Sequence, residues 1–219
     1  MSSKWIKNSK LTNKQIGRLI DYFILDVPAI KAAKMLSISR HSAERIYTTI
    51  RINIARECEK ESSLGGEVEV DESYFGGKRK GRRGRGAADK VPVFGILKRS
   101  GKVYTRIAED VSRKTLRRII RTKVIPESVV YSDSFRSYNG LVLDGFKHYR
   151  IEHDRGFIKE GRNHINGIDN FWGYAKTKLK GYYGISRRHY YLYLREMEFK
   201  FNNRNMDLRR IIRGVLKYS

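Results

Sequence analysis

Apolar side chains recur at helical spacing through the first sixty residues. This pattern predicts one helix that begins at an N-cap within 11–13, a second over 28–36 and a third over 40–56. The second and third helices are joined by the short connection 37–39. Such a pair is typical of a helix-turn-helix, although a plain three-helix packing module has the same pattern. We therefore predict a small all-α domain over residues 1–60, and a helix-turn-helix within it.

From residue 65 onward the pattern changes to short apolar runs separated by turns. These runs predict strands over 66–74, 91–99, 102–110, 128–133 and 147–153. Helical spacing predicts helices over 112–124, 163–180 and 188–203. Three successive strands, followed by strands that alternate with helices, indicate an α/β fold with a mixed five-stranded sheet flanked by helices. A short polar linker precedes it, so the second domain is predicted over residues 65–219.

The net charge of the chain limits the chemical classes of partner that it can bind. Its 219 residues include 47 Lys and Arg against 23 Asp and Glu, a net charge of +24. This excess predicts a polyphosphate partner, bound either by a simple binding protein or by an enzyme that acts on nucleic acid. The single cysteine, Cys58, excludes an internal disulfide framework and a zinc site built on cysteine pairs. With no signal-peptide core or apolar span, we expect a cytoplasmic, nucleoid-associated protein.

Two acids stand near the ends of predicted strands. Asp71 lies on the strand 66–74, and Asp133 closes the strand 128–133. Active sites of open α/β sheets gather at the carboxyl ends of strands, so we expect these two carboxylates to converge. Carboxylates that lie close together repel each other, and a divalent cation such as Mg²⁺ or Mn²⁺ relieves that repulsion.

A third ligand is expected from the helix over 163–180. Its apolar stripe is formed by Ile165, Ile168, Trp172, Ala175 and Leu179. Asp169 and Lys176 are seven residues apart and share the edge of this stripe. Asp169 is therefore the first candidate, followed by Asn166 and then Asn170, while a solvated surface acid is the alternative for Asp169. Three such acids would hold two metal ions for phosphodiester chemistry.

Several cations are predicted to contact DNA. The third helix would present its early polar residues to a major groove: Arg40, His41 and Arg45. The run GGKRKGRRGRG over 76–86 is predicted to be a loop whose cations contact phosphate: Lys78, Arg79, Lys80, Arg82, Arg83 and Arg85. Lys176, on the face of Asp169, is a further candidate for a contact with the substrate phosphate.

Four segments taken together resemble DDE-type bacterial insertion-sequence transposases of the ISXO-like group: VEVDESYFGGK, VYSDSFRSY, HINGIDNFWGYAK and LREMEFKFNNR. The resemblance implies an RNase H-like catalytic domain that uses two Mg²⁺ or Mn²⁺ ions. It makes Asp71 and Asp133 the first and second catalytic acids, and it makes Lys176 the basic residue two turns after the third. Asp169 occupies the third position, where such proteins commonly carry the longer Glu.

The resemblance also implies the activity and the partners. The chain would bind the terminal inverted repeats of double-stranded DNA, cleave the DNA and join it to a target, as a homodimer or a higher assembly. Many relatives carry an N-terminal zinc-binding element that this chain, with one cysteine, cannot form. Two alternatives stay open: an RNase H-like nuclease or resolvase that cuts without joining, and a catalytically silent DNA-binding regulator.

Overall fold

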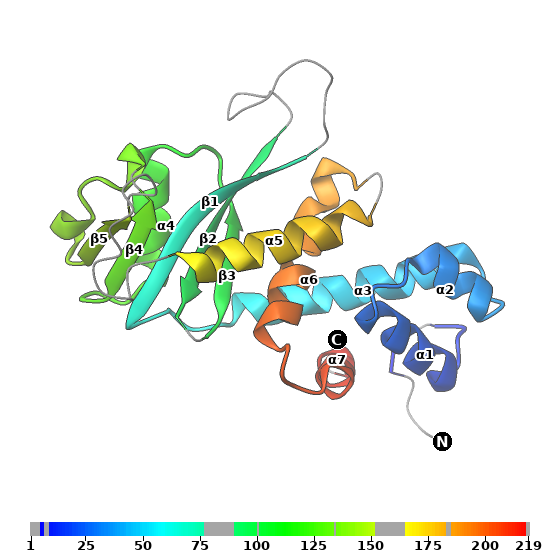
Figure 1. The fold of residues 1–219 in the computed structure, drawn as a ribbon. Helices are drawn as coiled ribbons and strands as arrows, with labels where there is room; N and C mark the ends of the chain where they lie inside the picture. Colours follow the sequence, from blue (N-terminus) through cyan, green and yellow to red (C-terminus); the bar gives the residue numbers. More distant parts are fainter. Residues whose placement is uncertain are drawn as a thin grey trace, which may run out of the picture. The chain divides into compact units, whose positions relative to one another are not determined.

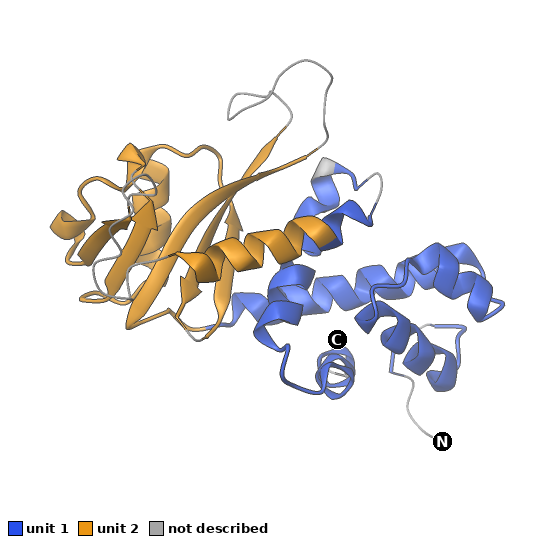
Figure 2. Cartoon of the chain, in the orientation of Figure 1, with its two compact units in different colours: residues 1–61, 178–219 blue, residues 62–177 orange. Residues whose placement is uncertain are grey.

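The chain forms two compact units, shown in Figure 2: residues 1–61 with 178–219, and residues 62–177. The computed structural model describes residues 5–6, 9–76, 90–99, 101–133, 135–151, 165–182 and 185–217. The sequence predicted domains over 1–60 and 65–219, whereas the C-terminal segment clusters with the N-terminal one. We call the two compact units unit 1 and unit 2, as Figure 2 does.

Unit 1 is helical, and side-chain caps set where its first helices begin. The Thr12 side chain accepts from the Gln15 N–H, and the Gln15 side chain accepts from the Thr12 N–H, which forms a capping box. The Ser39 side chain likewise caps its helix by accepting from the N–H of Ser42. The described helices of this unit are α1 (Asn13–Ile24), α2 (Ala29–Met35), α3 (Arg40–Glu59), η3 (Arg187–His189), α6 (Tyr190–Asn202) and α7 (Leu208–Lys217).

The core of unit 1 explains why residues 178–219 group with the N-terminal helices. Apolar residues of α1 and α3, such as Ile16 and Ile50, are fully buried in one cluster. Phe199 of α6 and Ile212 and Leu216 of α7 are buried in the same cluster. An amphipathic pattern predicts that a helix buries one face, but it does not say which other helices cover that face. Helix α7 itself was not predicted.

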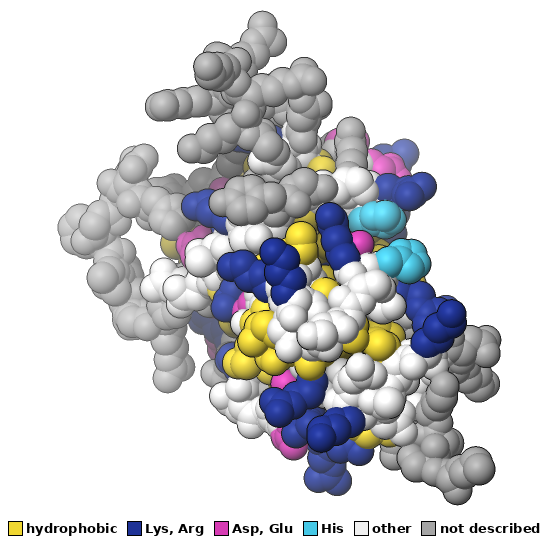
Figure 3. Space-filling model, turned by 90° about the vertical axis from the view of Figure 1, so that its right-hand side faces the viewer, with side chains coloured by type: hydrophobic (Ala, Val, Ile, Leu, Met, Phe, Trp, Pro, Cys, Tyr) yellow, Lys and Arg dark blue, Asp and Glu magenta, His cyan; other side chains and the backbone are white. Residues whose placement is uncertain are grey.

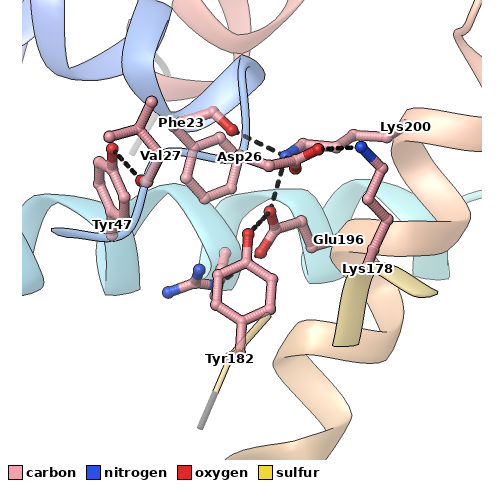
Figure 4. Close-up of polar contacts among 9 residues, drawn as sticks. Phe23, Asp26, Val27, Tyr47, Lys178, Tyr182, Glu196 and Lys200 are labelled. Atoms are coloured by element: carbon pink, nitrogen blue, oxygen red, sulfur yellow. Dashed lines mark hydrogen bonds and ion pairs between the residues drawn. The ribbon is translucent and has the colours of Figure 1, made fainter. Parts of the chain in front are cut away.

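A buried polar cluster joins the helices of unit 1 (Figure 4). Glu196 of α6 is fully buried. It accepts hydrogen bonds from Arg51 Nε at 2.7 Å, from Lys200 Nζ at 2.7 Å and from the Tyr182 hydroxyl at 3.2 Å. Lys200 also donates to Asp26, just after α1, at 2.6 Å. Buried charges are tolerated only when they are paired in this way, so the cluster fixes α6 against α1 and α3.

Unit 2 contains a mixed five-stranded sheet, as predicted (Figure 1). Its strands are β1 (Glu67–Phe75), β2 (Val91–Lys98), β3 (Val103–Ile107), β4 (Val129–Asp133) and β5 (Lys147–Ile151). The strand order is β3-β2-β1-β4-β5. The pairs β1–β2 and β2–β3 are antiparallel, whereas β1–β4 and β4–β5 are parallel. The parallel half therefore has its carboxyl ends on one edge.

Helices cover both faces of this sheet (Figure 1). On one face, Val68 and Val70 of β1 share a core cluster with Leu116 and Ile120 of α4 (Arg113–Lys123). The other face meets α5 (Asn166–Lys180), whose residues through 177 belong to unit 2. Two short helices, η1 (Arg136–Tyr138) and η2 (Leu141–Asp144), follow β4. Among the described helices, none combines the length and apolar content that a membrane span requires.

Candidate functional site

The two central acids stand at the same level of adjacent parallel strands. Glu69 of β1 pairs with Tyr131 of β4, and two residues further along each strand lie Asp71 and Asp133. Residues that share a level on neighbouring parallel strands point to the same face of the sheet. Both carboxylates are half-buried. The structure therefore brings both acids to the edge where β4 ends and the ladder between the strands stops.

Asp169 approaches from α5, where it lies in the first turn and is exposed. Burial raises the pKa of Asp71 to about 7, and the negative charge of Glu72 adds to this effect, followed by the charges of Asp133 and Asp169. Repulsion of this kind acts only between groups that lie close together. The charges of Asp133 on β4 and of Asp169 on α5 therefore both act on Asp71 of β1.

The oxygens of these acids suit a hard divalent cation in kind, since Mg²⁺ and Mn²⁺ favour carboxylate ligands. A cation would also relieve the burial and repulsion that raise the pKa of Asp71. One oxygen of each strand acid is already held: Asp71 Oδ2 by the Trp172 indole at 3.0 Å, and Asp133 Oδ1 by the Phe135 N–H at 2.9 Å. Within the described residues, no three His, Cys, Asp or Glu side chains are gathered tightly enough to hold a metal ion.

Trp172 reaches Asp71 because the strand beneath it has no side chain at one position. Gly95 of β2 pairs directly with Asp71. A Cβ atom at Gly95 would lie 2.5 Å from Cζ2 of Trp172, so the indole ring rests on the glycine backbone. The edge of the ring also packs against Phe75, with the centroids 5.8 Å apart. Sequence reasoning interpreted Trp172 as a core residue; it is buried, and it also orients Asp71.

Glu69 is a second functional residue that sequence reasoning missed. Its carboxylate is buried and accepts from the backbone N–H of Ile168 at 2.9 Å and from Arg99 Nε at 3.2 Å. An acid at the N-terminus of a helix satisfies an orphan N–H and favours the positive end of the helix dipole. Gly167 allows this approach, because a Cβ there would lie 2.9 Å from Glu69 Oε2. Glu69 thus positions the helix turn that carries Asp169.

The neighbouring acid Glu72 belongs to the opposite face of the sheet. It is buried and accepts a hydrogen bond from the Tyr138 hydroxyl at 2.7 Å. Tyr138 is itself fully buried in the core beneath α4. Glu72 therefore influences Asp71 by its charge, and its own carboxylate takes part in the core on the α4 side.

The remaining candidates on α5 are exposed: Asn166, Asn170 and Lys176. The Lys176 ammonium lies 5.9 Å from the centroid of the Phe75 ring, which itself contacts Trp172. Lys176 is therefore close to the end of β1, on the side of α5 where Asp71 is held. Its position agrees with the predicted contact to substrate phosphate, which stays a prediction.

The cations predicted to contact DNA divide into two groups. Arg40, His41 and Arg45 are exposed on the first turns of α3, while Ala43 and Ile46 between them are buried. Figure 3 shows a face of the protein on which Lys and Arg side chains border an apolar area. The second group lies outside the described residues: Lys78, Arg79, Lys80, Arg82, Arg83 and Arg85.

Comparison with known proteins identifies the family. The model of the ISXO2-like transposase domain matches residues 63–202, most of the chain and all three acids. An uncharacterized transposase-like protein of Haemophilus influenzae is 45% identical over 120 residues, which cover 52% of this chain and 97% of that protein.

Among solved structures, the Mos1 transposase paired-end complex with the left transposon end gives a TM-score of 0.36 at 12% identity, over 100% of this chain and 77% of that one. The Mos1 strand transfer complex gives a TM-score of 0.30 at 12% identity, over 100% and 81%. These TM-scores are too low to establish a common fold. From the match to the family model and the bacterial relative, the chain belongs to the family of insertion-sequence transposases with an ISXO2-like transposase domain.

Proposed function

We propose that this chain is a DDE-type transposase that cleaves and joins DNA through Asp71, Asp133 and Asp169. The observation that supports the proposal is the placement of Asp71 and Asp133 at the same level of adjacent parallel strands, with the charge of Asp169 also acting on the pKa of Asp71. Three acids drawn from two adjacent parallel strands and a helix start are a costly arrangement unless a cation or a substrate uses them.

The strand order and pairing support an RNase H-like catalytic domain in unit 2, with three antiparallel strands, two further parallel strands and helices on both faces. In unit 1, α2 and α3 are joined by a short turn in which Ser37 has a φ of 51°. We propose that this pair is a helix-turn-helix. Its second helix would contact the terminal inverted repeats through Arg40, His41 and Arg45.

The residues divide the work as follows. Asp71 and Asp133 would each supply a carboxylate, held by the Trp172 indole and by the Phe135 N–H respectively, and Asp169 would add a third carboxylate from α5. Two Mg²⁺ or Mn²⁺ ions held there would activate the attacking oxygen and stabilise the leaving oxygen of a phosphodiester. Lys176 contacts a phosphate of the DNA, and the cations of the loop over 76–86 add further phosphate contacts.

The test is a cleavage and strand-transfer assay on linear duplexes that carry the element ends, with a titration of Mg²⁺ and of Mn²⁺. Asp71→Asn and Asp133→Asn keep the size of each side chain and remove its charge. We expect both variants to lose cleavage to background and to keep the parent affinity for DNA. Calorimetry without DNA should show that both also lose Mn²⁺ binding.

The exposed Asn170, on the same helix, supplies a matched control. Asn170→Ala should cleave as the parent does, while Asp169→Asn should not. Asp169→Glu should retain activity, because the longer acid can still reach the same site. Cleavage without joining would identify a nuclease or resolvase, and DNA binding without any metal-dependent chemistry would identify a silent regulator. If Asp71→Asn and Asp133→Asn both lost DNA binding, these acids would have a structural role and the proposed enzymatic function would be refuted. Synapsis of two ends requires a dimer or higher assembly, which sedimentation with DNA would detect.

A further inference from the structure

The exposed side of helix α4 is strongly cationic, and the proposed catalytic site does not account for this charge. The helix sequence RKTLRRIIRTK contains six cations and no acid among its 11 residues. Leu116, Ile119 and Ile120 are buried in the core cluster beneath the helix. Six of the eight remaining positions are Lys or Arg, so one side of α4 is mainly apolar and covered, and the other is mainly cationic and exposed.

The long side chains of this face border an open hollow of about 800 Å³ on the surface of unit 2, lined by Arg113, Lys114, Arg117, Arg118, Arg121 and Thr122. Residues four positions apart lie on one row of a helix, separated by about 6 Å along its axis. Arg113, Arg117 and Arg121 therefore form one row, and Lys114 and Arg118 form the row beside it. The hollow between the rows is bordered by charge and contains no apolar side chain.

Nearby acids hold the side chain of Arg117 in place, whereas the side chains of Arg118 and Arg121 stay exposed to solvent. Arg117 makes a two-pronged ion pair with Asp144, in which both bonds measure 2.5 Å. Arg121 is 4.0 Å from the same carboxylate, and Arg118 is 3.9 Å from the exposed Glu109. The side chains of Arg118 and Arg121 remain 61% and 67% exposed, and ion pairs at such exposure contribute little.

We propose that Arg113, Lys114, Arg118 and Arg121, the α4 cationic face, bind the phosphate backbone of double-stranded DNA. Guanidinium groups match phosphate oxygens in geometry and are more weakly hydrated than ammonium groups, and three of these four residues are arginines. The net charge of +24 makes an extended polyanion the expected partner. Contacts that these side chains make with the phosphate backbone carry no sequence information.

The position of α4 separates this surface from the three acids. Asp71 points to the face of the sheet that α5 covers, whereas α4 packs against the opposite face. DNA bound to the α4 cationic face would therefore lie on the opposite side of the sheet from the phosphodiester bond that the three acids are proposed to cut. A site that grips any sequence suits DNA whose sequence is not recognised, such as flanking or target DNA. This assignment rests on the proposed function, since it supposes that the chain acts on DNA.

The experiment compares two variants of the full chain with the same change in charge. The first replaces the α4 cationic face: R113Q/K114Q/R118Q/R121Q. The control removes four exposed cations from elsewhere in unit 2: K98Q/K102Q/R106Q/K147Q. Fluorescence anisotropy with a duplex of random sequence, across a series of salt concentrations, gives the affinity and its salt slope. Glutamine keeps the helix propensity of the replaced residues, and circular dichroism checks the fold.

We expect the α4 variant to lose at least tenfold more affinity than the control. Its salt slope should fall by about 3.6, because each of the four lost phosphate contacts removes about 0.9 from the slope. Equal losses in the two variants would overturn the proposal, since only net charge would then matter. Polyglutamate serves as a second probe in the same assay. If the α4 variant lost affinity for polyglutamate but kept its affinity for the duplex, the proposal would be overturned and the face would be assigned to an acidic protein.

A measurement on the parent chain covers the case in which the α4 variant does not fold. Acetylation of Lys114 should slow at saturating duplex, and acetylation of Lys98 should not. Unchanged reactivity at Lys114 would refute a contact there. Neither readout needs cleavage, so both can be made without a divalent metal ion. If the parent never cleaves DNA but the α4 effects hold, the proposed function fails and the α4 binding surface stands.

Discussion

Replacing Gly95 with alanine tests whether Trp172 rests on the strand as described. The added Cβ would lie 2.5 Å from Cζ2 and 2.9 Å from Cη2 of Trp172. Carbon atoms in contact are ordinarily about 3.5–4.0 Å apart, so the ring must move by about 1 Å. The ring is rigid and is also held by Asp71 and Phe75, and it cannot turn aside as a flexible chain would.

The expected cost follows from these distances. Overpacking a core by one methyl group lowers the free energy of unfolding by about 1–3 kcal/mol. If the ring also leaves Asp71, a hydrogen bond to a charged group is lost, which adds about 1.5 kcal/mol. The better strand propensity of alanine offsets about 0.5–1 kcal/mol. With that hydrogen bond lost, we expect Gly95→Ala to lower the stability of unit 2 by about 1.5–4 kcal/mol.

Gly173, in the helix that meets this strand, provides the matched control. A Cβ there would find no atom within 4 Å, so Gly173→Ala should raise stability by about 0.5–1 kcal/mol through helix propensity alone. The same substitution should thus act with opposite sign at the two positions. In Gly95→Ala/Trp172→Leu the cost of the alanine should shrink, because the shorter side chain leaves room for it.

The assay is urea unfolding of each variant in a Trp5→Phe background. Trp5 lies at the edge of the unit 1 core, so its removal leaves Trp172 as the fluorescent probe of unit 2. The variants that carry Trp172→Leu contain no tryptophan, so their unfolding is followed by circular dichroism, as is that of the parent for comparison. Linear extrapolation gives the free energy of unfolding for each variant. An alanine at position 95 that leaves stability unchanged or raises it would refute the packing of Trp172 on Gly95. So would equal effects of Gly95→Ala in the parent and in the Trp172→Leu background.

Two further predictions concern unit 1. Burial acts to raise the pKa of Asp26, but Lys200 and Lys178 outweigh it and hold that pKa below the ordinary 3.8. The stabilisation is therefore complete above pH 3.8 and is lost as pH falls through the lowered value. Asp26→Asn should cost about 1–3 kcal/mol at pH 7 and flatten the acid limb of stability measured by thermal melts; an unchanged limb would contradict the pairing. Burial, followed by the charge of Glu198, raises the pKa of the Cys58 thiol, so a disulfide reagent should label it only in denaturant. Rapid labelling of the folded chain would show that Cys58 is accessible.

The placement of Asp71 and Asp133 on neighbouring strands that run the same way could be predicted, although Asp133 ends β4 whereas Asp71 lies in the middle of β1. Strand direction follows from the order of elements, and parallel strands bring their carboxyl ends to one edge. The buried stripe of α5 was also predictable from helical spacing, and all five of its residues are buried: Ile165, Ile168, Trp172, Ala175 and Leu179.

The roles of Glu69 and Trp172 could not be derived in the same way. Each depends on a contact between residues about a hundred positions apart, and each requires a glycine at the point of contact. Periodicity identifies the side of an element that is buried, but it does not identify the atoms that the side meets. One signal was present: the alternation in VEVDE places Glu69 on the same face of the strand as Asp71. The grouping of residues 178–219 with the N-terminal helices escaped prediction for the same reason.

The ion pair between Glu69 and Arg99 sets an order for folding. It joins residues 30 positions apart in one hairpin, whereas the bond from Ile168 to Glu69 spans 99 positions. Shorter closures form first, and an unpaired acid would oppose burial beneath a helix. The hairpin of β1 and β2 should therefore form before α5 docks, and pulsed hydrogen exchange would show its amides protected ahead of Ile168. A chain still emerging from the ribosome would then lack an assembled trio of acids, so catalytic competence would arrive only after α5 has been synthesised.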